Sequence, residues 1–320
     1  MSPMQILKRL RGRLIDLCVI IVGVSVLVFG FIRMIPGDAV AIMLGANAEV
    51  TPDRLAALRS RLGLDLPVHE QYFAWLWKVL HGDFGVSIWT GRPVIDEIGA
   101  HVWPTLQLML MAMFSAIVLA IPLGILMARM RGARGEPYVQ AGSVVGLTVP
   151  PFWLGIVMIL VFSAIMPKLQ MLGYVPFSKD PLGNIQRMIL PAFALSLPIT
   201  ANLARLLRST LLEALQQDYI RTARAKGVSA RRILYRHALR NAIISFVTSV
   251  GIQAGYLLGG AIVIEQVFAI PGLGRLILGA IAERNYPLLQ ATILLATAAF
   301  VLVNFVVDVI YTLIDPRISE

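Results

Sequence analysis

The sequence predicts an all-α polytopic membrane protein with six transmembrane helices. Hydrophobic residues make up 58% of the 320 residues and charged residues 14%, whereas soluble domains average about 25% charged residues. The mean hydropathy is +0.77. Crossing a bilayer takes about 20 apolar residues. Runs of about that length occur at 14–34, 105–128, 139–165, 188–207, 242–267 and 288–314.

Basic residues decide how the spans are oriented. They concentrate before the first span, after the second, and between the fourth and fifth, which is one side of the membrane if the spans alternate. An excess of basic residues marks the cytoplasmic side. The segment 1–13 and the tail 315–320 are therefore both predicted to be cytoplasmic. The residues are Lys8, Arg9, Arg11, Arg13, Arg129, Arg131 and Arg134, with nine more from Arg205 to Arg240, and Arg317 agrees.

The first span, 14–34, has a second interpretation as a cleaved signal peptide. Basic residues precede its apolar stretch, and Ala39-Val40-Ala41 resembles a small-residue cleavage site. Against this, the apolar run approaches full spanning length, and Arg33, Pro36 and Asp38 interrupt the approach to the site. The sequence favours a retained transmembrane helix.

Residues 35–103 form a long loop on the opposite, periplasmic side. The loop is net acidic and holds four of the five tryptophans. Its run His69–Leu80 predicts a short amphipathic helix, whose aromatic rings would suit the outer membrane interface. Packing within an extracytoplasmic subdomain explains the same pattern, and both interpretations stay open.

The remaining five spans form a core at 104–314. Prolines within spans remove backbone donors and predict kinks that neighbouring helices must accommodate. They are Pro122, Pro150, Pro151, Pro191 and Pro198.

Several kinds of chemistry are excluded. Cys18 is the only cysteine, none of the four histidines lies in a predicted span, and no HExxH pattern occurs. No lysine directly follows a glycine, so there is no Walker A loop for ATP. The net charge of +10 is explained by orientation in the membrane rather than by nucleic acid. We therefore expect no enzyme, metal site or bound cofactor in this chain.

A charged segment within the loop 208–241 has the pattern of two capped helices. Asp218 is predicted to cap a helix at 219–226, and Gly227 suits the left-handed position that ends it. Ser229 is predicted to cap a second helix that runs through Arg240. The first helix has only about two turns, and such helices are marginal in water unless they are docked.

The surface of this segment favours docking to an acidic protein. Ile220, Ala223 and Gly227 lie on one stripe, surrounded by positive charge. A solvated basic loop, or one attracted to anionic lipid, is the alternative. The candidate docking residues are Asp218, Tyr219, Ile220, Arg221, Thr222, Ala223, Arg224, Lys226, Gly227, Ser229 and Arg232, with Arg231 adding further charge.

The run Asp218-Tyr-Ile-Arg-Thr-Ala-Arg-Ala-Lys-Gly227 resembles the coupling loop of binding-protein-dependent ABC transporter permeases. The general form reads Glu-Ala-Ala, three residues, then Gly. Here Arg221-Thr222-Ala223 and Gly227 occupy those positions. The sequence of the whole run from Asp218 to Gly227 is typical of the peptide/nickel/glutathione subfamily.

The resemblance continues along the chain in order. The matching stretches are Arg33-Met-Ile-Pro-Gly-Asp38, Leu62-Gly-Leu-Asp65, His81-Gly-Asp83-Phe-Gly85-Val-Ser87, Glu265-Gln-Val-Phe268, Pro271-Gly-Leu-Gly274-Arg275 and Asp315-Pro-Arg-Ile318.

The resemblance implies a type I ABC importer permease fold in the bacterial inner membrane. It implies a heterodimer of this chain with a homologous second permease subunit, and two ATP-binding cassette subunits that bind ATP and Mg²⁺ and engage the coupling loops. A periplasmic substrate-binding protein would deliver the solute: di- or oligopeptides, glutathione or nickel.

Within the membrane, Gly251, Gly255 and Gly259 share one helix face and predict close packing, either within the subunit or against the second permease. Asn304 and Asp308 lie one turn apart in the sixth span. Together with Glu265 they are candidates for the path or for polar contacts inside the bundle.

Two rival classes fit less well. An ion-coupled secondary transporter is expected to hold ionisable groups near midplane, often on repeated halves. Here Asp16, Glu265 and Asp308 lie toward span ends, and no repeat is evident. An intramembrane enzyme would need a catalytic pair or metal ligands at depth, and the spans hold no such group.

Overall fold

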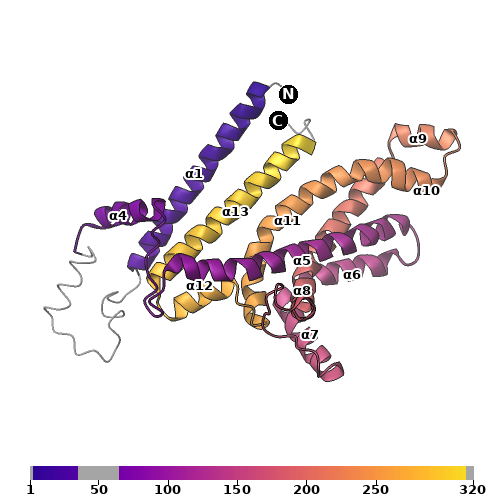
Figure 1. The fold of residues 1–320 in the computed structure, drawn as a ribbon. Helices are drawn as coiled ribbons and strands as arrows, with labels where there is room; N and C mark the ends of the chain where they lie inside the picture. The colour runs from indigo at the N-terminus through magenta and orange to yellow at the C-terminus, as the bar shows by residue number, and fades with distance from the viewer. Residues whose placement is uncertain (1–2, 35–64, 315–320) are drawn as a thin grey trace. The chain divides into compact units, whose positions relative to one another are not determined.

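The computed structural model describes residues 3–34 and 65–314, with side chains described at 12, 15–34 and 65–305. The helices of the described chain are joined by turns and loops (Figure 1), and its one isolated β-bridge lies between Val86 and Pro93. It forms two compact units. The first holds residues 3–34, 65–103 and 273–302, and the second holds 104–272 and 303–314.

The first unit contains α1 (Pro3–Met34), α4 (Val68–Leu80), α12 (Leu273–Ala282) and the first parts of α5 (Val94–Arg129) and α13 (Tyr286–Ile314). The helix predicted at His69–Leu80 is therefore confirmed as α4.

Helix α4 packs one side against α1. Tyr72 shares a hydrogen bond of 2.8 Å with Ser25, and its ring meets Phe29 edge-on at 5.5 Å between centroids. Phe73 and Trp77 on α4 are exposed. The helix thus makes internal contacts and still presents aromatic rings outward.

A turn at residues 84–93 is fastened to the connection between α12 and α13. Asn285 is buried; its Oδ1 accepts from the backbone of Ile88 at 3.3 Å, and its Nδ2 donates to Ser87 at 2.8 Å. The indole of Trp89 donates to the carbonyl of Glu283 at 2.8 Å. These bonds join segments almost 200 residues apart in sequence.

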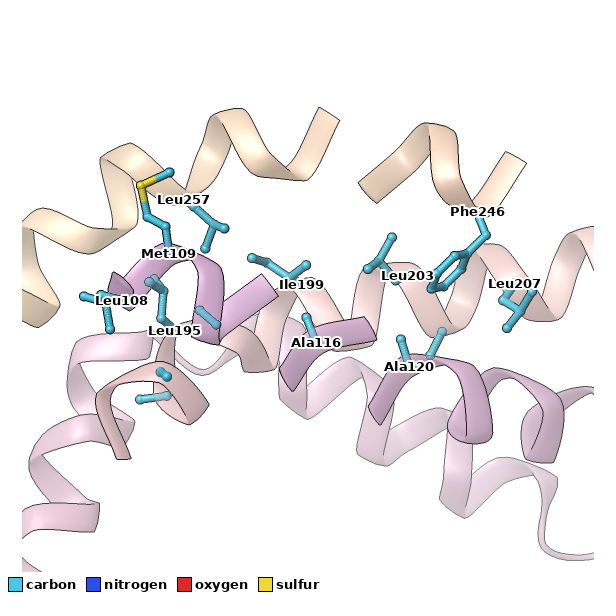
Figure 2. Packing of buried hydrophobic residues seen from close by; sticks show 14 of the residues in the cluster. Leu108, Met109, Ala116, Ala120, Leu195, Ile199, Leu203, Leu207, Phe246 and Leu257 are labelled. Carbon is cyan, nitrogen blue, oxygen red and sulfur yellow. The ribbon is translucent and has the colours of Figure 1, made fainter. Parts of the chain in front are cut away.

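The second unit is built on three long helices: α5, α8 (Pro181–Ala214) and α11 (Leu239–Val267). Figure 2 shows their side chains meeting along the shared interface. A Cβ at Gly124 of α5 would lie 2.9 Å from the carbonyl oxygen of Ala204, so glycine allows α5 to approach α8 closely. Lipid tails are as apolar as leucine, so this close packing, rather than escape from water, holds the helices together. The labelled residues are Leu108, Met109, Ala116, Ala120, Leu195, Ile199, Leu203, Leu207, Phe246 and Leu257.

The third predicted span, 139–165, is not one straight helix. It is replaced by α6 (Glu136–Thr148) and α7 (Pro151–Ile165), which meet at an angle of 100°. Val149, between them, has φ −71° and ψ 119°. Proline disfavours helical geometry in the residue before it, and the pair Pro150-Pro151 lacks two backbone donors. The prolines therefore end α6 and start α7 in a new direction.

Five described helices are long and apolar enough to cross a membrane, and six if the bent α6–α7 pair counts as one span. Several run beyond the predicted limits. Helix α5 begins at Val94 rather than near 105, and α8 covers 181–214 rather than 188–207. Their polar ends continue the helix outside the apolar stretch, which hydropathy alone does not reveal. Pro122, Pro191 and Pro198 lie inside continuous helices.

Candidate functional site

The basic segment after α8 forms a short helix, α9 (Asp218–Ala225). The extended residue that begins it is Gln217, whose carbonyl accepts from Ile220 and Arg221. Asp218 was predicted to be this cap, and that prediction is wrong. Its side chain is 95% exposed and lies 3.5 Å from Arg221. As the first helical residue, its carboxylate still complements the positive end of the helix dipole.

The end of α9 has the predicted left-handed glycine. Gly227 has φ +75°, its N–H donates to Arg224, and the N–H of Val228 donates to Ala223. This is the Schellman arrangement, which satisfies the last carbonyls of a helix. Among the described atoms, nothing lies within 4 Å of a Cβ built at Gly227. Backbone geometry, not space, therefore requires glycine there.

The second predicted helix does not end at Arg240. Ser229 precedes α10 (Ala230–Arg232), which continues through a π-helical turn, η1 (Ile233–Ala238), into α11. Ser229 is the cap residue, although its side chain makes no capping bond in the described structure. The stretch has no proline or glycine from 230 to 250 to interrupt it. The basic segment is thus joined directly to a membrane-spanning helix.

Ile220 is the anchor of α9. It was predicted to face a partner, but the structure shows its side chain fully buried. Helix α9 packs against η1, where Ile233 and Ala238 are also buried. Burying an isoleucine contributes about 2 kcal/mol, which is enough to hold a helix that is marginal alone.

The other candidate docking residues remain accessible. Ala223 is half-buried, and the rest are exposed: Asp218, Tyr219, Arg221, Thr222, Arg224, Lys226, Gly227, Ser229 and Arg232. The predicted residues are therefore accessible on α9, on the turn that follows it and on α10, except Ile220, which is buried.

A cleft of about 780 Å³ adjoins this surface. Apolar residues share its lining with Arg129, Arg224 and Arg231, which come from the end of α5, from α9 and from α10. A cleft of this composition suits an acidic group on an otherwise apolar protein surface. Its lining residues are Ala128, Arg129, Leu215, Arg224, Val228, Ala230, Arg231, Ile233, Leu234 and Tyr235.

An ion pair fastens the start of α6 to α8 near this end of the unit. Glu136 contacts Arg208 and also accepts from the backbone N–H of Gly132 at 2.6 Å and from Gln140 at 2.8 Å. The side chain of Arg208 is 24% exposed and that of Glu136 is 21% exposed. The contact holds the turn after α5 against the helix that leads into α9.

Glu265 lies at the far end of α11 from α9 and is fully buried. Thr105 donates to its carboxylate at 2.5 Å. A Cβ at Gly272 would overlap the same carboxylate, so the backbone closes over it. Of the two roles predicted for Glu265, this position fits a polar contact inside the bundle.

A second polar group closes the same end of the unit. The amides of Gln107 and Asn184 bond to each other, and Asn184 also donates to the carbonyl of Val175 at 2.6 Å. Tyr174 donates to Gln107 at 3.1 Å. Burial raises the pKa of Tyr174 above its ordinary value. These bonds fix the loop between α7 and α8, and no sequence pattern indicated them.

The three predicted packing glycines differ in their surroundings. Gly251 and Gly255 are buried, whereas Gly259 is exposed. The adjacent Gly260 faces α8, where an added Cβ would lie 2.9 Å from Leu195.

Of the polar pair predicted in the sixth span, Asn304 is half-buried on α13. The side chain of Asp308 lies outside the described residues, as do the predicted stretches at 35–64 and 315–318. Within the described part of the chain, no cluster of His, Cys, Asp and Glu could hold a metal ion.

Comparison with known proteins places these features in a family. Residues 120–320 match the family described as binding-protein-dependent transport system inner membrane component. Residues 6–98 match the N-terminal family of the same transport systems' membrane components.

Similar proteins and one similar structure cover most of the chain. A peptide transport system permease protein of Brucella abortus (strain 2308) is 40% identical over 92% of this chain and 93% of its own length. The glutathione transport system permease protein GsiC of Escherichia coli (strain K12) is 40% identical over 98% of both chains. A solved inward-facing structure of the MetNI methionine ABC transporter shares the fold, with a TM-score of 0.56 and 20% identity over 69% of this chain and 97% of that chain. The chain therefore belongs to the family of binding-protein-dependent transport system inner membrane components.

Proposed function

We propose that this permease subunit imports short peptides, glutathione among them, and that α9 couples it to subunits that hydrolyse ATP. The observation that carries the proposal is the construction of α9. It is an exposed basic helix held from beneath by one buried residue, Ile220, and a short turn joins it to the helix that continues through η1 into a membrane span.

The exposed side of α9 suits an acidic protein partner. Arg224 belongs both to this surface and to the adjoining cleft, where Arg129 and Arg231 add positive charge. An acidic side chain of an ATP-binding subunit would accept charge-assisted hydrogen bonds from these arginines. Apolar side chains next to it on that subunit would pack against the apolar lining of the cleft. Each of two such subunits, with its ATP and Mg²⁺, would engage one permease of a heterodimer.

Movement of α9 would pass directly into the bundle. The segment from Ala230 to Val267 is one long helix with a π-helical turn, and α11 packs against α8 along the core. π-helical turns in longer helices are frequent at functional sites. ATP-driven closure of the partner subunits would thus bias the bundle between inward- and outward-facing states.

We assign the end that carries α9 to the cytoplasm, and with it both chain termini. Arg129 after one span and Arg224 before another line the same cleft, which agrees with a single basic side of the membrane. The opposite end, with Glu265 and the α7–α8 loop, would face the periplasm and receive the solute from a binding protein.

The proposed solutes follow from the similar proteins, whose names specify peptides and glutathione. These molecules share amide groups and charged termini, and they differ mainly in side chains. A solute-binding protein outside the membrane would carry out most of the selection.

Reconstitution tests the proposal. The full complex in proteoliposomes, with ATP inside and binding protein outside, should take up radiolabelled dipeptides or glutathione only when ATP is present. The chain purified alone should show no ATP hydrolysis. Uptake that follows an ion gradient without ATP would contradict the proposal.

A charge reversal then tests α9 itself. Arg231→Glu in the cleft should abolish binding-protein-stimulated ATP hydrolysis, because the acidic partner would be repelled. Arg131→Glu is the matched control, since Arg131 is exposed and does not appear in the cleft lining. Equal activity of the two variants would contradict docking at this surface.

A further inference from the structure

One face of α11 is exposed along the membrane-spanning part of the helix. Its members recur at steps of three and four residues, or two turns in one case, so they form a single line. We name this line the α11 stripe. It consists of Ser245, Ile252, Tyr256, Gly259, Val263 and Gln266.

Tyr256 lies near the middle of the membrane on this line. It is 11 residues before the end of α11 at Val267, which is about 17 Å along the helix, and the hydrocarbon core is about 30 Å thick. The side chain is 73% exposed. From that depth its hydroxyl cannot reach the headgroups, and lipid tails offer no hydrogen-bond partner.

The exposed face of α5 in the same unit has a different composition. Its residues Leu106, Leu110, Phe114 and Val118 are 38%, 65%, 69% and 50% exposed and are all apolar. Such a face is compatible with lipid tails. Within the α11 stripe, Tyr256 instead places a hydroxyl near the middle of the membrane, where lipid tails would leave it without a hydrogen-bond partner.

The other side of α11 is already occupied. Phe246 and Leu257 pack into the shared core with α8 (Figure 2), and Gly260 brings the backbone close to Leu195. The α11 stripe therefore lies on a different side of the helix from its contact with α8.

We propose that the α11 stripe lines the aqueous passage and that Tyr256 contacts the solute halfway across. This rests on the proposed function as a peptide importer. The tyrosine hydroxyl can donate to and accept from peptide amides, and its ring offers an apolar surface to side chains. The stripe has no charged residue, so it would hold no terminus of a peptide tightly and would release solutes of differing sequence.

Cysteine labelling tests the passage, because the chain has one native cysteine. In a Cys18→Ser background, Tyr256→Cys and Phe114→Cys are compared in the whole complex in nanodiscs. The reagent is the charged, water-soluble methanethiosulfonate ethylsulfonate. The reagent reacts with the thiolate form of cysteine, and apolar surroundings disfavour that form. A cysteine in an aqueous passage at 256 should therefore react at least about tenfold faster than one facing lipid at 114. Labelled Tyr256→Cys complexes should also lose uptake.

Gly259→Cys gives a second variant on the same line, and a Cβ there meets no described atom within 4 Å. If neither stripe variant reacts faster than Phe114→Cys, in nucleotide-free and vanadate-trapped complexes alike, the proposal is overturned. Uptake that persists after complete labelling would also overturn it. Uptake and stimulated ATP hydrolysis by the Cys18→Ser parent test the proposed function separately, since labelling requires no transport.

Discussion

Replacing Ile220 with alanine removes the side chain that fastens α9 to η1. Ile220 is fully buried but lies outside the core of α5, α8 and α11, so the change acts on α9 and leaves the bundle folded. Removing a buried isoleucine side chain costs about 2–5 kcal/mol. Each 1.4 kcal/mol is a tenfold change in an equilibrium, so a loss of about 3 kcal/mol raises the undocked population of α9 about 100-fold.

Hydrogen–deuterium exchange on the assembled complex measures this population. The N–H groups of Lys226, Gly227 and Val228 all donate within the end of α9, and they should exchange about 100-fold faster in the Ile220→Ala variant. Ile220→Val removes one methylene group at a cost of about 1 kcal/mol and should give about a fivefold change.

The matched control is Leu203→Ala, which alters a fully buried core residue of α8. It should lower the melting temperature of the bundle, whereas Ile220→Ala should leave that temperature unchanged and abolish ATP-driven uptake. Wild-type protection of the α9 amides in Ile220→Ala would refute the reasoning, because α9 would then be held by something other than this side chain.

Three further changes have defined outcomes. Gly227→Val should cost about 1–3 kcal/mol, since a β-branched residue is strained at positive φ, and it should lower the uptake obtained per ATP hydrolysed. Gly227→Asn should retain most coupling, because asparagine tolerates that region, and equal uptake per ATP hydrolysed in the two variants would argue against the turn. Arg208→Gln should lower the melting temperature of the detergent-solubilised complex, because Glu136 loses its cationic partner; no change would show the pair to be dispensable. Gly272→Ala should reduce the yield of folded protein by size-exclusion chromatography, since its methyl group overlaps the carboxylate of Glu265, and a normal yield would mean that this end of α11 relaxes easily.

Local signals in the sequence predicted much of the basic segment around α9. Gly227 was identified because few residues other than glycine end a helix in the left-handed conformation, and the accessible basic residues followed from their charge. The burial of Ile220 was missed because a stripe of apolar and small residues does not reveal which way it faces. Knowing that required η1, which packs against α9 and was itself expected to be an ordinary helix.

Contacts between distant segments had no local signal. The two prolines at 150 and 151 predicted a kink, but the angle of 100° depends on how α6 and α7 each pack against α8. The buried amide of Asn285 bonds to Ser87 and Ile88, almost 200 residues away. Hydropathy located the spans, but it could not show where polar helix ends stop.

The length of the helix that follows α9 decides how far the basic segment stands from the lipid. Placing one edge of the hydrocarbon at Val267 puts the other edge about 20 residues earlier, near Val247. The middle of η1 is then about 11 residues, or about 16 Å, beyond that edge, and the headgroup layer fills only about 6 Å of this distance. The remaining gap of about 10 Å exceeds the Debye length of about 8 Å in physiological salt. Because α9 packs against η1, we expect anionic phospholipid to attract α9 only weakly if the helix crosses the bilayer without tilt, and its arginines to stay available to a protein that approaches from the aqueous side.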